Sequence, residues 1–112
     1  MVTQSLTQEL IKLQADFCSA LSDPTRLLIL YALSETPRNV TELTNELQVT
    51  QPTVSRHLKI LRERGLVQTT RAGTTITYSL VDQRLIQAID LMRAVMRDRI
   101  AYRANLIEEI DS

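Results

Sequence analysis

The segment from Thr50 to Gly65 constrains the fold more than any other part of the sequence. Val54, Leu58 and Leu61 recur at the spacing of a helix that buries one face. The opposite face carries hydrogen-bond donors and cations, namely Gln51, Thr53, Ser55, Arg56 and Lys59. These side-chain types contact base edges and phosphates in DNA grooves. An ordinary amphipathic surface helix would show the same pattern, so the neighbouring segments must decide between the two interpretations.

Both ends of this helix carry sequence signals. Thr50 is a favoured N-cap residue, and Pro52 fits the first turn because its missing N–H would be unpaired there anyway. Gly65 is typical of the residue that follows a helix. The sequence therefore predicts a short helix over about residues 51–64, which we call the reading helix.

Positive charge gathers on this segment, although the net charge of the chain is zero. Residues 51–71 carry five basic side chains and one acidic side chain, whereas residues 1–50 carry three basic and six acidic ones. A local basic patch is the electrostatic footprint of phosphate contact. We therefore expect double-stranded DNA as the partner, with Lys59, Arg62 and Arg71 mainly in contact with phosphates.

Two helices are expected in the first third of the chain. An apolar stripe predicts one over about residues 4–21. Its members are Leu6, Leu10, Leu13, Phe17 and Leu21. Asp23 then caps a second helix, which has Pro24 in its first turn and ends before Pro37.

A third, short helix is expected directly before the reading helix. Asn39 and Glu42 have the spacing of a capping box, in which each side chain bonds to the backbone of the other residue. Gln48 and Val49 then form the turn that leads into the reading helix. A short helix, a turn and a second short helix make the helix-turn-helix arrangement.

Beyond Gly65 the periodicity changes from that of a helix to that of strands. Residues 66–80 are rich in Val, Ile, Thr and Tyr, and predict a β-hairpin with Gly73 where a positive φ is needed. A basic hairpin after a helix-turn-helix is a wing, and Arg71 at its tip could reach the minor groove or a phosphate. Asp82 then caps a long last helix over about residues 82–106.

The first and last helices are too apolar for the ends of so small a domain. We expect them to pack across the axis of a twofold homodimer, which would cover both stripes. The alternative is that both helices cap the core of a single chain. The fold class expected is a single domain over residues 1–112, mainly α with a small β-hairpin, a winged helix-turn-helix that dimerises through its terminal helices.

Two motifs resemble those of the ArsR-type winged-helix repressors. Residues 21–30, Leu-Ser-Asp-Pro-Thr-Arg-Leu-Leu-Ile-Leu, are similar to the opening signature of that family. Residues 51–61 resemble its recognition helix, and Arg71 to Leu80 resemble its wing. The resemblance covers about residues 15–82 and implies a homodimeric, promoter-binding repressor. It also implies that an inducer, often a metal ion, lowers the affinity for DNA.

The chain departs from that family at the metal ligands. Many members carry Cys-Val-Cys-Asp-Leu where residues 39–43 read Asn-Val-Thr-Glu-Leu, and neither Asn nor Thr binds soft metals. Others carry an Asp-x-His pair on the last helix, of which only Asp90 is present. One histidine and one cysteine are too few for a four-coordinate zinc site. We therefore expect no metal site and no cofactor.

His57 and Cys18, the single histidine and the single cysteine, each allow two interpretations. His57 is included among the DNA-binding residues, as a packing or phosphate-contacting side chain that titrates near neutral pH. Cys18 reads as a small buried hydrophobic residue, and the alternative is a redox switch across the dimer axis. A single cysteine also fits a reducing, cytoplasmic compartment.

Other function classes have less support. No glycine-rich phosphate loop or catalytic constellation is present, so an enzyme is not expected. No segment is apolar enough to span a membrane, and the first twenty residues lack the pattern of a signal peptide. The remaining alternative is a winged-helix dimerisation or protein-interaction module that does not read DNA. The sequence does not identify the inducer, the operator or the direction of regulation.

Overall fold

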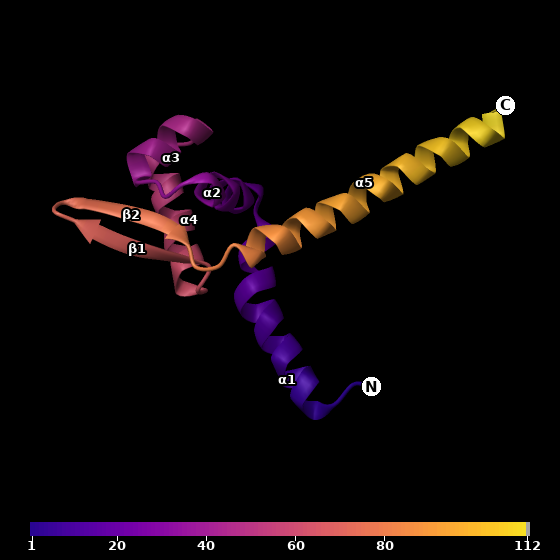
Figure 1. Cartoon of the computed structure of the whole chain (residues 1–112), viewed down its shortest axis with the longest axis horizontal. Coiled ribbons are helices and arrows are strands. Elements are labelled where there is room, and N and C mark those ends of the chain that lie inside the picture. The colour runs from indigo at the N-terminus through magenta and orange to yellow at the C-terminus, as the bar shows by residue number, and fades with distance from the viewer. Residues whose placement is uncertain (112) are drawn as a thin grey trace. The chain divides into compact units, whose positions relative to one another are not determined.

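The computed structural model describes residues 1–111 of the chain (Figure 1). It divides into two compact units, Met1–Asp82 and Gln83–Ser112. The first unit contains α1 to α4 and a hairpin, and the second contains α5. The bounds are α1 Gln4–Leu13, α2 Pro24–Glu35, α3 Val40–Leu47, α4 Gln51–Glu63, β1 Val67–Ala72, β2 Thr75–Leu80 and α5 Arg84–Asp111. The expected fold class, mainly helical with one small hairpin, is confirmed.

The predicted helix starts of α2 and α3 are present as hydrogen bonds. The Asp23 carboxylate accepts from the Thr25 backbone N–H at 2.7 Å and so caps α2. At α3, the Glu42 N–H donates to Asn39 Oδ1 at 2.8 Å, and the Asn39 N–H donates to Glu42 Oε1 at 3.0 Å. All three bonds satisfy backbone donors that a helix end would otherwise leave unpaired.

The N-terminal segment is not one regular helix over residues 4–21. The α-helix α1 ends at Leu13, and a π-helical turn follows over Gln14–Cys18. The Ser19 N–H donates to the Gln14 carbonyl at 3.0 Å, which closes the wider i to i+5 ring. A short 3₁₀ turn over Ala20–Ser22 then leads to the cap of α2. The wider turn takes in one extra residue, so the apolar stripe does not continue along one straight face.

The core of the first unit is formed by α2, α3, α4 and the base of the hairpin. Helix α2 packs against α3, α4 and β2. The side chains buried most completely are Ile29, Leu30, Leu43, Val54, Leu58, Leu61 and Leu66. Burying this apolar surface fixes α4 on the body, since each large aliphatic side chain contributes about 1.5–3 kcal/mol when removed from water.

The hairpin is antiparallel and pairs Val67 with Leu80 at its base and Ala72 with Thr75 at its tip. Gly73 and Thr74 form a two-residue loop, and Gly73 has the positive φ expected, +64°. The first strand, β1, continues to Ala72, directly before this loop.

The base of the hairpin is also joined to the loop between α2 and α3. The Arg38 N–H donates to the Tyr78 carbonyl at 3.0 Å, and the Tyr78 N–H donates to the Arg38 carbonyl at 2.8 Å. These two backbone bonds form an isolated bridge on the side of β2 away from β1. The hairpin is therefore held to the body of the first unit through its second strand.

The second unit is a single long helix, α5. It begins at Arg84 rather than at the predicted Asp82, and continues to Asp111, beyond the predicted residue 106. Many of its apolar side chains are exposed, namely Leu91, Met92, Val95, Met96, Ile100, Leu106, Ile107 and Ile110. Among the described residues, no helix is long and apolar enough to cross a membrane.

Candidate nucleic-acid interface

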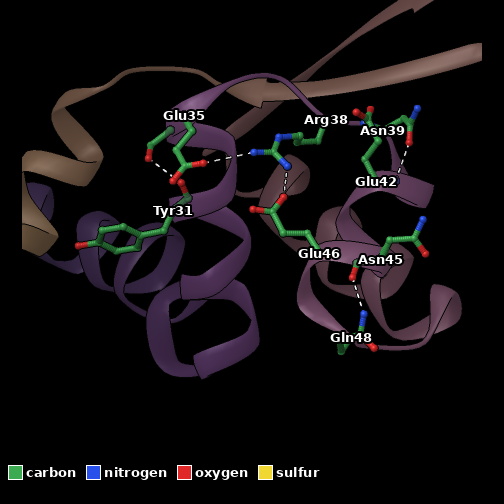
Figure 2. Close-up of polar contacts among 9 residues, drawn as sticks. Tyr31, Glu35, Arg38, Asn39, Glu42, Asn45, Glu46 and Gln48 are labelled. Carbon is green, nitrogen blue, oxygen red and sulfur yellow. Dashed lines mark hydrogen bonds and ion pairs between the residues drawn. The ribbon is translucent and has the colours of Figure 1, made fainter.

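A tight corner joins α3 to the reading helix α4. Gln48 ends α3 in the left-handed region, with φ +56° and ψ +43°, and its N–H donates to the Thr44 carbonyl at 3.0 Å. Its side chain donates to the Asn45 carbonyl at 2.6 Å (Figure 2). A left-handed residue that is not glycine is uncommon, and the two local hydrogen bonds offset its conformational cost. This corner sets the direction in which α4 starts.

Thr50 occupies the N-cap position of α4, as the sequence predicts, but its side chain does not bond to the helix backbone. Its hydroxyl lies 2.8 Å from that of Thr53 instead. Both hydroxyls are therefore held at the start of the helix, next to the exposed Gln51 and Pro52.

The reading helix has the two faces that its sequence predicts. Val54, Leu58 and Leu61 are fully buried on the body of the first unit. The exposed polar and charged residues of the other face are Gln51, Ser55, Arg56, Lys59, Arg62 and Glu63, while Thr53 is half-buried. Rigid burial of one face holds the polar and basic side chains on a fixed scaffold, as a helix that enters the major groove requires.

His57 lies apart from these exposed side chains, with only 5% of its surface accessible. Its Nδ1 lies 3.1 Å from Nη1 of Arg26, and its Nε2 lies 3.9 Å from Oδ1 of Asp23. We therefore leave His57 out of the proposed contact residues, because its ring packs inward and is almost completely covered. Of the two interpretations of His57 in the sequence, packing agrees with its buried position.

The surroundings of His57 also determine how it titrates. Burial lowers the pKa of the His57 imidazole below its usual 6.5, and the positive charges of Arg26 and Arg56 act in the same direction. The Asp23 carboxylate opposes that shift. The pKa of Asp23 is itself lowered, chiefly by the hydrogen bond from the Thr25 N–H.

The wing presents Arg71 close to its tip. The side chain is exposed, and its Nε donates to the Gly73 carbonyl at 3.1 Å. Behind the reading helix, Arg64 pairs with Asp16 of the π-helical turn at 3.7 Å. The exposed basic side chains Lys59, Arg62 and Arg71 thus come from the reading helix and from the wing that follows it.

Sequence reasoning missed two arginines that support this surface. Arg26 holds the buried side of the reading helix through His57. Arg38 forms ion pairs with Glu46 of α3 and Glu35 of α2 (Figure 2). A basic residue next to a predicted helix boundary gives no hint of such partners, since they lie on other elements.

Neither Cys18 nor the positions that match the family's metal motifs form a metal site within the described residues. The Cys18 thiol is exposed, whereas the sequence favoured burial. Asn39 and Glu42 are occupied in the capping box, and Asp90 pairs with Arg93 at 3.1 Å. Over residues 1–111, the structure brings together no group of three His, Cys, Asp or Glu side chains that could hold a metal ion.

Comparison with known proteins identifies relatives among bacterial and archaeal transcriptional regulators. Residues 23–69 match the family described as bacterial regulatory protein, arsR family. The HTH-type transcriptional repressor SmtB of Mycobacterium tuberculosis is 38% identical over 82 residues, which cover 73% of this chain and 61% of SmtB. The HTH-type transcriptional regulator MJ1325 of Methanocaldococcus jannaschii is 40% identical over 79 residues, which cover 70% of this chain and 89% of that relative.

The solved structures agree with the sequence relatives. The crystal structure of the transcriptional repressor BigR from Xylella fastidiosa superposes with a TM-score of 0.70 at 30% identity. The match covers 84% of this chain and 96% of BigR. The matched family region, residues 23–69, extends from the cap of α2 through the reading helix into β1. The chain belongs to the ArsR family of winged helix-turn-helix transcriptional regulators.

Proposed function

We propose that this chain is a homodimeric, sequence-specific repressor that binds double-stranded DNA in the cytoplasm. Family membership supports the class of function, and the two-faced reading helix supports DNA as the partner. The observation that carries the proposal is the fully buried row Val54, Leu58 and Leu61 behind an exposed polar and basic face. An interaction module would need acidic or bulky apolar side chains across that exposed face, where Glu63 is the one acidic residue and no large apolar side chain is exposed.

The proposed contacts divide into two groups. Gln51, Thr53, Ser55 and Arg56 face the bases, where their amide, hydroxyl and guanidinium groups read donor and acceptor patterns. Lys59, Arg62 and Arg71 contact phosphates mainly and supply affinity without sequence information. Two copies related by a twofold axis would read an imperfect palindrome with half-site centres about 10–10.5 base pairs, or a multiple of that, apart.

Exposed apolar side chains support the homodimer. Leu10, Ile11 and Leu13 are exposed on α1, and α5 exposes apolar residues along most of its length. A second copy is the simplest cover for such surfaces, because most oligomers of this kind have twofold symmetry. Sedimentation equilibrium tests this part: the mass of a dimer is expected, and a monomer at micromolar concentration would contradict it.

We also propose that the repressor is not a conventional metal sensor. Asn39 and Glu42 already bond to each other's backbone, and Thr41 offers a hydroxyl rather than a thiolate. The exposed Cys18 is the proposed alternative as a redox switch. In this reading zinc leaves DNA binding unchanged, and an oxidant alters it.

Fluorescence anisotropy tests the central claim. Reduced protein would be titrated on the DNA upstream of its own coding sequence and on a scrambled duplex of equal composition, at about 150 mM salt. A preference of at least about a thousandfold is expected, since specific sites exceed nonspecific ones by that much. Equal, weak and salt-sensitive binding to the upstream duplex, the scrambled duplex and a genomic fragment library would contradict sequence-specific repression.

A further inference from the structure

The Arg26 guanidinium joins the turn before α2 to the reading helix α4. Its Nε donates to the Ala20 carbonyl at 2.6 Å, and its Nη2 donates to the Ser19 carbonyl at 3.4 Å. Its Nη1 lies 3.1 Å from Nδ1 of His57, thirty-one residues further along the chain. All of these groups lie within the first compact unit. One side chain therefore fixes the buried side of the reading helix to a segment that makes no proposed contact with DNA.

This contact dictates the protonation state of His57. An arginine side chain has only donors and stays charged, so Nδ1 of the imidazole must be the acceptor and carry no hydrogen. The ring proton of the neutral form is then on Nε2, the nitrogen that lies 3.9 Å from the Asp23 carboxylate. In the neutral ring, the acceptor Nδ1 therefore faces the cationic donor Arg26, and the protonated Nε2 faces the anionic Asp23.

A second proton has no suitable place in this arrangement. It would bind to Nδ1 and turn that acceptor into a donor that points at the Arg26 guanidinium. The charged groups around the ring are Asp23 at the N-cap of α2, Arg26 in α2 and Arg56 in α4. One anion faces two cations, and only 5% of the His57 surface is exposed to water that could solvate the charge. Protonation must therefore break the Arg26–His57 hydrogen bond.

We propose that Arg26 and His57 are positioning residues for the reading helix, and that protonation of His57 releases this helix and weakens DNA binding. The inference rests on the proposed DNA-binding function and adds a proton as a regulator of the same surface. Arg56, a proposed base contact, directly precedes His57 in α4, so a movement of the buried ring is passed to the reading face. Acidification below neutral pH is the expected signal.

A nuclear magnetic resonance titration tests the coupling without DNA. The chain has one histidine, so its imidazole signals need no assignment by mutation. At pH 8 we expect Nδ1 to be unprotonated and Nε2 to be protonated, with a midpoint below 6.5 on acidification. The amide signals of α4 should shift with the same midpoint. A ring protonated on Nδ1 at pH 8, or α4 amides that ignore the titration, would overturn the proposal.

The second measurement is the pH dependence of binding to the upstream duplex between pH 7.5 and 5.5. Wild-type affinity should fall by up to about tenfold for each pH unit below the midpoint. The variant His57→Asn keeps an amide oxygen near Nδ1 as an acceptor for Arg26 and does not titrate, so its affinity should stay flat. Arg26→Ala should bind weakly at both ends of the range. Equal pH slopes for wild type and His57→Asn would overturn the proposal.

Two controls keep these outcomes distinct. Circular dichroism at each pH shows whether a variant is folded, and His57→Gln replaces His57→Asn if the latter does not fold. If the wild type shows no preference for the upstream duplex at pH 8, the proposed function fails rather than the coupling. The resonance titration then decides on the coupling alone.

Discussion

The Arg38 guanidinium forms an ion pair with the Glu46 carboxylate, although the two residues come from different elements (Figure 2). Arg38 is in the loop before α3, and its side chain is only 15% exposed, whereas Glu46 is near the end of α3 and its side chain is 36% exposed. A second carboxylate, that of Glu35 at the end of α2, lies 3.3 Å away and is 72% exposed. One arginine therefore ties both helices to the loop whose backbone also carries the wing.

The two acidic partners of Arg38 should differ in their contribution to stability. Glu46→Gln removes the charge from the more buried pair and should lower the free energy of unfolding by about 1 kcal/mol. Glu35→Gln is the matched control, and its effect should stay within about 0.5 kcal/mol because water screens that pair. Urea unfolding at pH 7 measures both. An equal fall in the free energy of unfolding for the two variants would show that solvent exposure does not determine how much each ion pair contributes.

Arg56 and Lys59 should affect DNA binding in different ways. Arg56→Ala should cost about 1–3 kcal/mol on the operator and relax its specificity, since a base contact is lost. Lys59→Ala should weaken binding to all sequences alike and flatten the salt dependence by about one unit. Anisotropy titrations at several salt concentrations distinguish the two. If Arg56→Ala lowers the affinity for operator and for scrambled DNA by the same factor, Arg56 does not read bases.

The capping box at α3 should be measurable as stability. Asn39→Ala removes the acceptor for the Glu42 N–H and should lower the free energy of unfolding by about 1 kcal/mol. Asn45→Ala lies on the same helix at an exposed interior position, where alanine is the better helix former, and should cost nothing. Thermal unfolding of the two variants side by side provides the comparison. An equal fall in Tm for both would argue against the cap.

Features that depend on neighbours a few residues apart could be predicted from the sequence. Asp23 and Asn39 were identified as caps because their partners are two and three residues away. The positive φ of Gly73 follows from its place in a two-residue hairpin loop. The π-helical turn after Leu13 could not be predicted, because an i to i+5 bond leaves no mark in residue type.

The sequence contained a signal that His57 is buried, but the polar character of histidine concealed it. Val54, His57, Leu58 and Leu61 occupy i, i+3, i+4 and i+7, which is the full pattern of a core-facing helix. A histidine in a basic stretch also suggests a phosphate contact, so the sequence left packing and phosphate contact as two interpretations of this residue. Its partner Arg26 is thirty-one residues away, and no local spacing records such a contact.

His57 should also make the stability of the protein depend on pH. Its pKa is lowered in the folded state, so the unfolded chain binds more protons below about pH 6.5. The free energy of unfolding should therefore fall as pH decreases from 6.5 and should change little from this group above pH 7.5. Urea unfolding between pH 5.5 and 7.5 measures the slope. If the free energy of unfolding of His57→Asn depends on pH as steeply as that of the wild type, other groups cause the dependence.

Cys18 can be tested as a redox switch with a single substitution. Its thiol is exposed, so peroxide can reach it, and oxidation should change the operator affinity of the wild type. Cys18→Ser should bind DNA like the reduced wild type and ignore the oxidant. Anisotropy before and after peroxide, with recovery by a reducing agent, measures the effect. Identical responses from both proteins would exclude Cys18 as the sensor.

The bridge between Arg38 and Tyr78 leaves the wing with one open edge. Within the described residues, β2 pairs with β1 on one side and with Arg38 on the other, whereas the outer edge of β1 pairs with no strand. Such an edge invites another chain to add a strand, and charged residues on a short strand discourage this. We therefore expect the charge of Arg71 on β1 to discourage such pairing, and replacement of Arg71 by an apolar residue should lower the solubility of the protein.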